Sequence, residues 1–189
     1  MFIKKYVAVP LLATLLALAV ASSPAVAASA TASAASATVA SAMRTGTEAG
    51  PFNVVPRHNL GKCLDVTNNS TADGTPMQIF DCLGSQQYNQ IFYLFPVSGT
   101  PYYRIAPTST WKCLDVRGVS LANFAIVQQY TCLGDFQRNQ LWSVLYDHGV
   151  GGFAIIPAHS NKPMTIGGGW NHAPVYQYSG INYWHLIPV

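Results

Sequence analysis

Charged residues are scarce in this sequence of 189 residues, since Asp, Glu, Lys and Arg together make up 9% of it. Apart from Lys4 and Lys5 near the N-terminus, eight Lys and Arg residues stand against seven Asp and Glu residues, which is a net charge of about +1. No cluster of basic residues occurs, and such a cluster is the usual mark of a nucleic-acid-binding surface. We therefore do not expect nucleic acid as a partner.

Motifs that carry catalysis are also missing. The sequence has no Gly-x-Ser-x-Gly and no His-Glu-x-x-His motif. A glycosidase needs two carboxyl groups about 5 to 10 Å apart, and the one Glu, Glu48, lies outside the part expected to fold. The five His residues show no metal-ligand spacing, and His159, His172 and His185 are expected at surface or loop positions. These absences predict a protein that is not an enzyme and binds no metal or cofactor.

Long apolar runs are rare as well. One run of 16 residues, from Tyr6 to Ala21, follows Lys4 and Lys5, and the small-x-small sequence of residues 25–27 comes soon after it. This order is typical of a secretory signal peptide, whereas a membrane-spanning helix needs about 20 apolar residues. We therefore predict a signal peptide over residues 1–27, a secreted protein and no membrane span.

Residues 28–50 consist almost wholly of Ala, Ser, Thr and Gly. Such a segment has little apolar surface to bury and shows no amphipathic face, so we expect a disordered linker. The remaining residues, 51–189, are enough for one domain.

That domain contains a repeat with a period of 50 residues. GKCLDVTNNSTADGTPMQIFDCLGSQQYNQIF begins at Gly61, and WKCLDVRGVSLANFAIVQQYTCLGDFQRNQLW begins at Trp111. A third, degraded copy lacks both Cys residues and has Thr165 where Asp65 and Asp115 stand. The sequence therefore divides into three units, at about 51–100, 101–150 and 151–189.

The units predict an all-β fold. Each contains short apolar segments separated by Gly, Pro, Asn, Asp and Thr, and none shows a helical period over ten residues. Three such units fit a closed structure with pseudo-threefold symmetry, because closure removes exposed sheet edges.

The four Cys residues form two pairs with the same spacing of 19 positions. Zinc sites need Cys pairs two to four residues apart, so a zinc site is not favoured. Four Cys allow three pairings, and the repeat favours the one that closes each copy on itself. The predicted disulfides are Cys63–Cys82 and Cys113–Cys132.

One Asp stands inside the apolar Cys-Leu-Asp-Val strand of each of the first two copies, as Asp65 and Asp115. A buried carboxylate needs partners, so the Asp either caps a turn or accepts hydrogen bonds from a polyhydroxylated ligand. Amides and an aromatic face at fixed spacing would suit the hydroxyls and the C–H face of a sugar. Gln90 and Gln140, which precede an apolar-x-aromatic pattern, are interpreted more readily as structural.

The Cys-Leu-Asp-Val, aromatic-x-Cys and Asn-Gln-x-Trp series resembles the ricin B-type β-trefoil lectins, also called family 13 carbohydrate-binding modules. The Gln-x-Trp signature stands complete at residues 140–142 and is softened at 90–92 and 182–184. The resemblance covers residues 52–189 and implies a β-trefoil with one shallow sugar pocket in each subdomain.

By this resemblance, two copies carry complete sugar sites in which the Asp and Asn hold hydroxyls, the first Gln assists, the aromatic residue stacks on the ring and the second Gln orients the Asp. The predicted carbohydrate-binding residues are Asp65, Gln78, Phe80, Asn89 and Gln90 in the first copy, and Asp115, Gln128, Tyr130, Asn139 and Gln140 in the second. The third copy keeps an aromatic, Tyr178, but has Thr165, Tyr176 and Ile181 at the polar positions, so we expect it to bind no sugar.

Galactose-type sugars are common ligands of such domains, and other glycans are bound as well. The sequence does not distinguish between these ligands. The alternative function is a trefoil that binds protein, such as an inhibitor or the cell-binding subunit of a toxin. Exposed aromatic residues in the third copy, for example Trp170, would suit such a protein partner.

Overall fold

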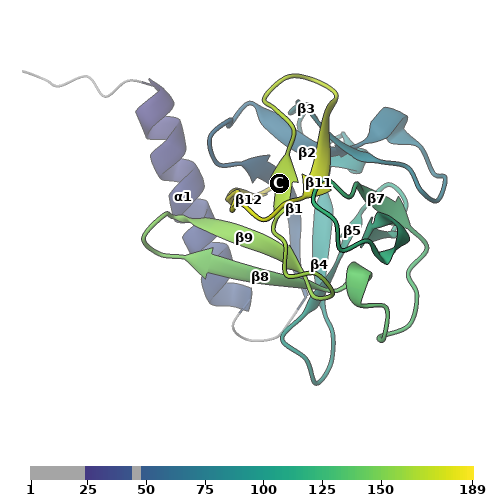
Figure 1. Ribbon diagram of the computed structural model, residues 1–189. Coiled ribbons are helices and arrows are strands. Elements are labelled where there is room, and N and C mark those ends of the chain that lie inside the picture. Colours follow the sequence, from purple (N-terminus) through teal and green to yellow (C-terminus); the bar gives the residue numbers. More distant parts are fainter. Residues whose placement is uncertain (1–23, 44–47) are drawn as a thin grey trace, which may run out of the picture.

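The computed structural model describes residues 24–43 and 48–189, and from residue 49 onward its main regular elements are β-strands (Figure 1). The strands are β1 (Ala49–Pro56), β2 (Lys62–Val66), β3 (Met77–Asp81), β4 (Phe92–Pro96), β5 (Tyr103–Pro107), β6 (Cys113–Val116), β7 (Val127–Tyr130), β8 (Trp142–Asp147), β9 (Gly152–Pro157), β10 (Met164–Ile166), β11 (Ala173–Gln177) and β12 (Trp184–Pro188). Short 3-10 turns η1 (Thr67–Asn69), η2 (Tyr88–Gln90), η3 (Arg117–Val119) and η4 (Arg138–Gln140) lie between them.

Six of the strands close into a barrel in the order β1-β12-β9-β8-β5-β4. The other six form three antiparallel hairpins, β2–β3, β6–β7 and β10–β11, one from each sequence repeat. Each repeat therefore supplies barrel strands and one hairpin, and the molecule is a β-trefoil. The prediction of an all-β fold built from three subdomains is confirmed.

Equivalent apolar residues of the three repeats meet in one core. Leu64, Leu114 and Met164 on the hairpins are each 0% exposed. The aromatic residues of the Gln-x-aromatic pattern are also fully buried, and two of them, Trp142 and Trp184, donate their indole N–H to the carbonyl oxygens of Leu114 and Met164 at 3.0 and 3.1 Å. This contact therefore fastens the second and third hairpins to the barrel, where a buried carbonyl needs a donor.

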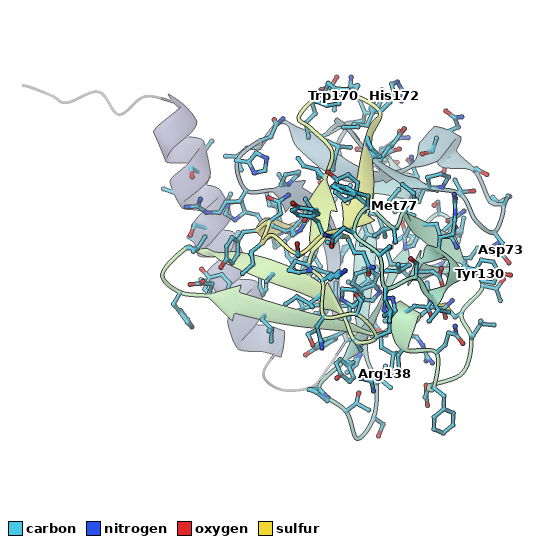
Figure 2. The ribbon with its side chains drawn as sticks, viewed as in Figure 1. Asp73, Met77, Tyr130, Arg138, Trp170 and His172 are labelled. Carbon is cyan, nitrogen blue, oxygen red and sulfur yellow. A yellow bond between two sulfur atoms is a disulfide. The ribbon has the colours of Figure 1, made fainter. Side chains whose placement is uncertain are left out.

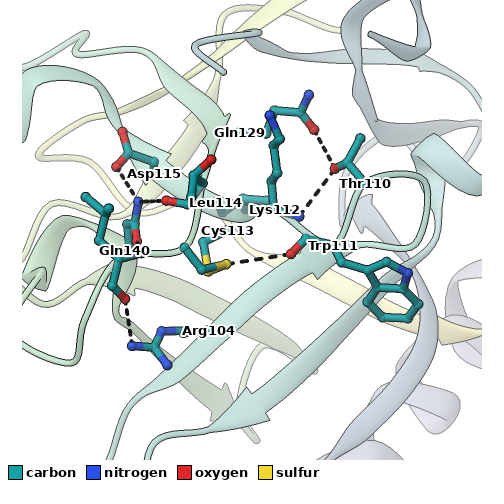
Figure 3. The surroundings of a disulfide bond; sticks show 12 residues. Arg104, Thr110, Trp111, Lys112, Cys113, Leu114, Asp115, Gln129 and Gln140 are labelled. Carbon is teal, nitrogen blue, oxygen red and sulfur yellow. Dashed lines mark hydrogen bonds between the residues drawn. A yellow bond between two sulfur atoms is a disulfide. The ribbon is translucent and has the colours of Figure 1, made fainter. Parts of the chain in front are cut away.

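Both predicted disulfides are confirmed. Cys63 is joined to Cys82 and Cys113 to Cys132, so each bond ties one hairpin to the segment that follows it. Figure 3 shows the surroundings of the second bond, with Asp115 and Gln140 close by. The disulfides therefore lie directly beside the residues predicted to form the sugar sites.

The segment before the barrel differs from the expected disordered linker of residues 28–50. Residues Pro24–Met43 form helix α1, which packs mainly against strand β12 and also contacts β9 (Figure 1). Ala has the highest helix propensity, and its small side chain permits close approach: Ala32 is 6% exposed, and the Ser33 hydroxyl donates to the Gly151 carbonyl at 3.3 Å. Tertiary contact therefore supports a helix that has no amphipathic pattern of its own.

The predicted signal peptide falls mostly on residues 1–23, which lie outside the described residues, and its last four residues belong to α1. No helix in the described part of the chain is long and apolar enough to cross a membrane.

The disulfides generate a stability prediction. A Cys113→Ala, Cys132→Ala variant should lose about 3 kcal/mol of unfolding free energy, because the bond no longer restricts a loop spanning 19 positions in the unfolded chain. Urea denaturation followed by tryptophan fluorescence measures this loss. The Cys63→Ala, Cys82→Ala variant should show a similar loss, and an unchanged midpoint in both variants would contradict the expectation.

Candidate functional site

The two repeated Asp residues sit at equivalent places on strands β2 and β6. Asp65 pairs across the hairpin with Gln78, and Asp115 pairs with Gln128. Both carboxylates are almost completely buried, with 3% and 4% of their residues' surface exposed. An ionised carboxylate at this depth requires several hydrogen-bond donors.

Side-chain amides supply those donors. Gln78 Nε2 donates to Asp65 Oδ1 at 2.8 Å, while Asn89 Nδ2 and Gln90 Nε2 donate to Oδ2 at 2.9 and 3.0 Å. Turn η2 places Asn89 and Gln90 next to each other in the chain, so both reach the same oxygen. A carboxylate offers about four acceptor positions, and the amides take three of them. The fourth, on Oδ1, receives no further hydrogen bond from the described residues.

The second subdomain repeats this geometry with turn η4. Gln128 Nε2 donates to Asp115 Oδ1 at 2.9 Å, and Asn139 Nδ2 and Gln140 Nε2 donate to Oδ2 at 2.8 and 3.1 Å. The agreement extends to the backbone, because Asn89 and Asn139 also donate to the carbonyl oxygens of Val66 and Val116. The two sites are therefore copies in structure as well as in sequence.

Gln90 and Gln140 act from behind the carboxylate. Each is 0% exposed and does not line the hollow that opens over its own Asp. Besides Asp65, Gln90 donates to the Asp81 carbonyl and accepts from the Leu83 backbone N–H. These contacts make the two Gln residues positioning groups.

Two surface hollows open over the Asp residues, and the predicted aromatic residue stands at the edge of each. Hollow 1 has a volume of about 220 Å³ and is lined by Asp65, Asn68, Asn69, Gln78, Phe80, Leu83, Gln87, Asn89 and His172. Hollow 2 has a volume of about 430 Å³ and is lined by Gly74, Asp115, Arg117, Gly118, Val119, Gln128, Tyr130, Leu133, Gln137 and Asn139. Each hollow thus gathers four of the five residues predicted for it.

Some lining residues were not expected from the sequence. Gln87 and Gln137 donate to the Asn89 and Asn139 side-chain oxygens at 2.7 Å and so fix which way those amides face. Gln87 and Gln137 lie 50 residues apart, so the repeat could have identified them as site residues. Arg117 has no such signal, because the equivalent residue of the first copy is Thr67.

Two of the His residues add something that the sequence did not suggest. His172 lines hollow 1, although it belongs to the third repeat, and His185 is 0% exposed within β12. Figure 2 shows His172 and Tyr130 on separate parts of the surface, consistent with two separate hollows. The expectation of a surface or loop position was therefore wrong for His185, whereas His172 does lie in an exposed turn.

The third hairpin has a hollow of another kind. Thr165 pairs with Tyr176 in place of the Asp–Gln pair, and the hollow beside it contains no carboxylate. Its lining residues are His58, Thr165, Ile166, Gly168, Gly169, Tyr178, Gly180, Ile181 and Asn182. The absence of a sugar in this third hollow stays a prediction.

Burial controls the charge of the site. Loss of solvation raises the pKa of Asp65 and of Asp115 above the ordinary 3.8, and the amide hydrogen bonds offset part of this rise. In contrast, the hydrogen bond from Lys112 lowers the pKa of Asp73, and contact with Asn171 lowers that of Asp81. As pH rises, ionisation of the two buried Asp residues therefore lowers the free energy of unfolding, whereas ionisation of the two surface Asp residues raises it.

This contrast generates a pH prediction. A raised folded pKa means that the Asp contribution to stability is fully present below pH 3.8 and is lost as pH rises through the folded pKa. The unfolding free energy of the wild type, minus that of an Asp65→Asn, Asp115→Asn variant, should therefore fall as pH rises from 3.8 and then level off. Denaturation at a series of pH values tests this, and the surface Asp residues cancel in the difference. A difference that increases with pH would show that the amides outweigh burial.

Comparison with known proteins agrees with this architecture. The family described as ricin-type beta-trefoil lectin domain-like matches residues 38–130 and 88–178, two stretches that begin 50 residues apart, as the repeat does. No match was found among curated proteins.

Several solved structures are similar. The designed threefold-symmetric protein ThreeFoil is 31% identical with a TM-score of 0.67, and the match covers 75% of this chain and 100% of ThreeFoil. The exo-β-1,3-galactanase 1,3Gal43A from Clostridium thermocellum is 26% identical with a TM-score of 0.65, covering 74% of this chain and 30% of the galactanase.

The Rhizoctonia solani agglutinin shares the fold at 18% identity, with a TM-score of 0.64 and coverage of 75% of this chain and 96% of the agglutinin. The family match spans well over half of the sequence, and the fold and repeat agree with it. The chain belongs to the ricin-type β-trefoil lectin domain-like family.

Proposed function

We propose that this domain is a secreted, non-catalytic carbohydrate-binding module that holds one sugar in each of hollows 1 and 2. The observation that carries the proposal is the buried Asp with three amide donors and one open acceptor position, repeated beside a partly exposed aromatic ring. A sugar edge offers hydroxyl donors for that acceptor, and its C–H face matches the ring of Phe80 or Tyr130.

Pre-organisation supports this proposal over a purely structural role for the Asp. The amides that hold Asp65 are themselves held, since Gln87 fixes Asn89 and the backbone of residues 81 and 83 fixes Gln90. A ligand therefore meets groups that are already oriented, which reduces the entropy lost on binding.

The comparisons suggest which saccharides to test first. The galactanase of 26% identity acts, by its name, on β-1,3-galactan, so galactose and β-1,3-galacto-oligosaccharides are the first probes. A single shallow hollow gives weak binding, with Kd on the order of 1 mM. Two hollows on one chain raise avidity for a polymer or a glycan-covered surface. The two disulfides suit an oxidising compartment and so support secretion.

The test removes each aromatic face without disturbing the buried Asp network. Phe80→Ala and Tyr130→Ala should each weaken one of the two binding events by about 10-fold or more, and the double variant should weaken both, because the stacking surface is gone. Isothermal titration calorimetry or ligand-observed NMR measures this, after a glycan panel has identified the best-bound saccharide.

Trp111→Ala is the matched control. Trp111 is 54% exposed and packs against Tyr93 and Phe95, outside both hollows. It should bind sugar as the wild type does. If the folded wild type binds no glycan on the panel, carbohydrate binding is excluded, and a protein partner becomes the function to test.

A further inference from the structure

The tips of the three hairpins are arranged in a ring. Gly74, Phe124 and His172 occupy equivalent positions, and all three have left-handed backbone, with φ of 78°, 65° and 68°. The N–H of each tip donates to a strand carbonyl of the next subdomain in the ring. These contacts are Gly74 to Gln129 at 2.9 Å, Phe124 to Gln177 at 2.8 Å and His172 to Ile79 at 2.8 Å.

Because of this ring, a tip residue projects toward the site of its neighbour and not toward its own. Bridges Pro76–Gln128, Ile126–Tyr176 and Pro174–Gln78 continue the contact beyond the tips. His172 of the third subdomain accordingly lines hollow 1, and Gly74 of the first lines hollow 2.

In hollow 1 the tip residue is His172, and its imidazole ring covers one side of the hollow. The imidazole of His172 meets Phe80 edge-on, with ring centroids 5.0 Å apart and an interplanar angle of 64°. Its Nδ1 lies 3.0 Å from Gln78 Oε1. The tip thus touches both the expected stacking residue and an amide that holds Asp65.

The Asp network also determines how this ring is protonated. An ionised Asp65 accepts only, so Gln78 turns its NH₂ toward Asp65 and its oxygen toward His172. Nδ1 must then carry the proton, and in the neutral ring Nε2 is an acceptor for a ligand hydroxyl. His172 therefore adds a wall and an acceptor that no residue of the first repeat provides.

Hollow 2 lacks this wall. Its tip is Gly74, and the donor to the Gln128 side-chain oxygen is Arg117 Nε, at 2.7 Å, which comes from the same subdomain as the site. Arg117 Nη2 also donates to the Gly74 carbonyl at 2.9 Å, which holds the bare tip in place. A Cβ built on Gly74 would have its nearest contact at 3.8 Å, with Gln128 Oε1, so there is space for a side chain here.

The third site shows the opposite extreme. Phe124 packs on Tyr176 and Tyr178 with centroid distances of 5.1 and 5.0 Å. Its ring covers the very tyrosine that stands at the stacking position of this repeat. The tip position therefore carries an imidazole at hollow 1, no side chain at hollow 2 and a phenyl ring at the third site.

We propose that the hairpin-tip residue donated by the neighbouring subdomain determines what length of saccharide each hollow accepts. His172 closes one side of hollow 1, which takes a single terminal sugar. Gly74 leaves hollow 2 open on that side, and its volume of 430 Å³ against 220 Å³ accommodates further residues of a saccharide chain. This inference rests on the proposed carbohydrate binding.

The test compares galactose with β-1,3-galactotriose in proteins that keep one hollow. In the Tyr130→Ala protein only hollow 1 binds, and the two ligands should differ by less than about twofold in Kd. In the Phe80→Ala protein only hollow 2 binds, and the triose should bind about tenfold more tightly because more of the chain is in contact. Calorimetry gives both constants.

Gly74→His in the Phe80→Ala protein should transfer the wall and bring the tenfold ratio down to about twofold. Gly74→Ala is the matched control, because it imposes the same left-handed strain without a ring and should leave the ratio unchanged. His172→Gly in the Tyr130→Ala protein relieves strain and should raise its ratio, which keeps the test open if Gly74→His does not fold.

The outcomes separate the two proposals. No binding of either ligand by any folded protein removes the carbohydrate function itself. Binding with the same ratio in Gly74→His and Gly74→Ala, or with no change in His172→Gly, overturns the role of the tip while leaving the carbohydrate function intact.

Discussion

The carboxylate of Asp65, like that of Asp115, joins three parts of its subdomain that the chain keeps apart. It lies on one hairpin strand, receives a donor from the opposite strand, and receives two more from a turn 24 and 25 residues later. Removing the carboxylate would take one acceptor from each of three buried amides, and removing an amide would leave a buried charge with fewer partners. The buried carboxylate therefore needs the amides as donors, and the amides need the carboxylate as an acceptor. The shape of the hollow depends on both.

The third subdomain shows which parts of this unit belong to the fold alone. It keeps the buried aromatic of the Gln-x-aromatic pattern, Trp184, whose indole holds the Met164 carbonyl as Trp142 holds that of Leu114. It has neither the disulfide nor the Asp network. Its hairpin still forms, and its tip is anchored to the first subdomain by Asn171, which bonds with Lys62 and Asp81. Core packing and inter-subdomain polar contacts are thus sufficient for this third hairpin, so a hairpin of this fold does not require the Asp network.

The repeat in the sequence predicted an all-β structure of three similar units and both disulfides, because equivalent residues must occupy equivalent places in a symmetric structure. The β-trefoil and the roles of the site residues came from the resemblance to the ricin B-type lectins. The repeat could not predict contributions that break the symmetry. His172 lies 107 positions from Asp65 in the chain and reaches hollow 1 only because the hairpins close into a ring. Arg117 takes over the bond to Gln128 that His172 makes to Gln78, and nothing in the spacing of these residues indicates the exchange. Helix α1 was missed for a related reason, since its support comes from the barrel strands that it contacts, chiefly β12, and not from its own sequence pattern.

The ring of hairpin tips also limits how independent the three sites can be. A tip residue lies in one repeat but contacts the hollow of the next, so a substitution within the third repeat changes the first site and one within the first repeat changes the second. The left-handed backbone at all three tips favours Gly, yet Phe124 and His172 occupy two of them at a cost of about 1 to 2 kcal/mol each. In both cases the side chain packs against aromatic residues of the neighbouring subdomain. These contacts offset the backbone cost, and they make each hollow a joint product of two repeats.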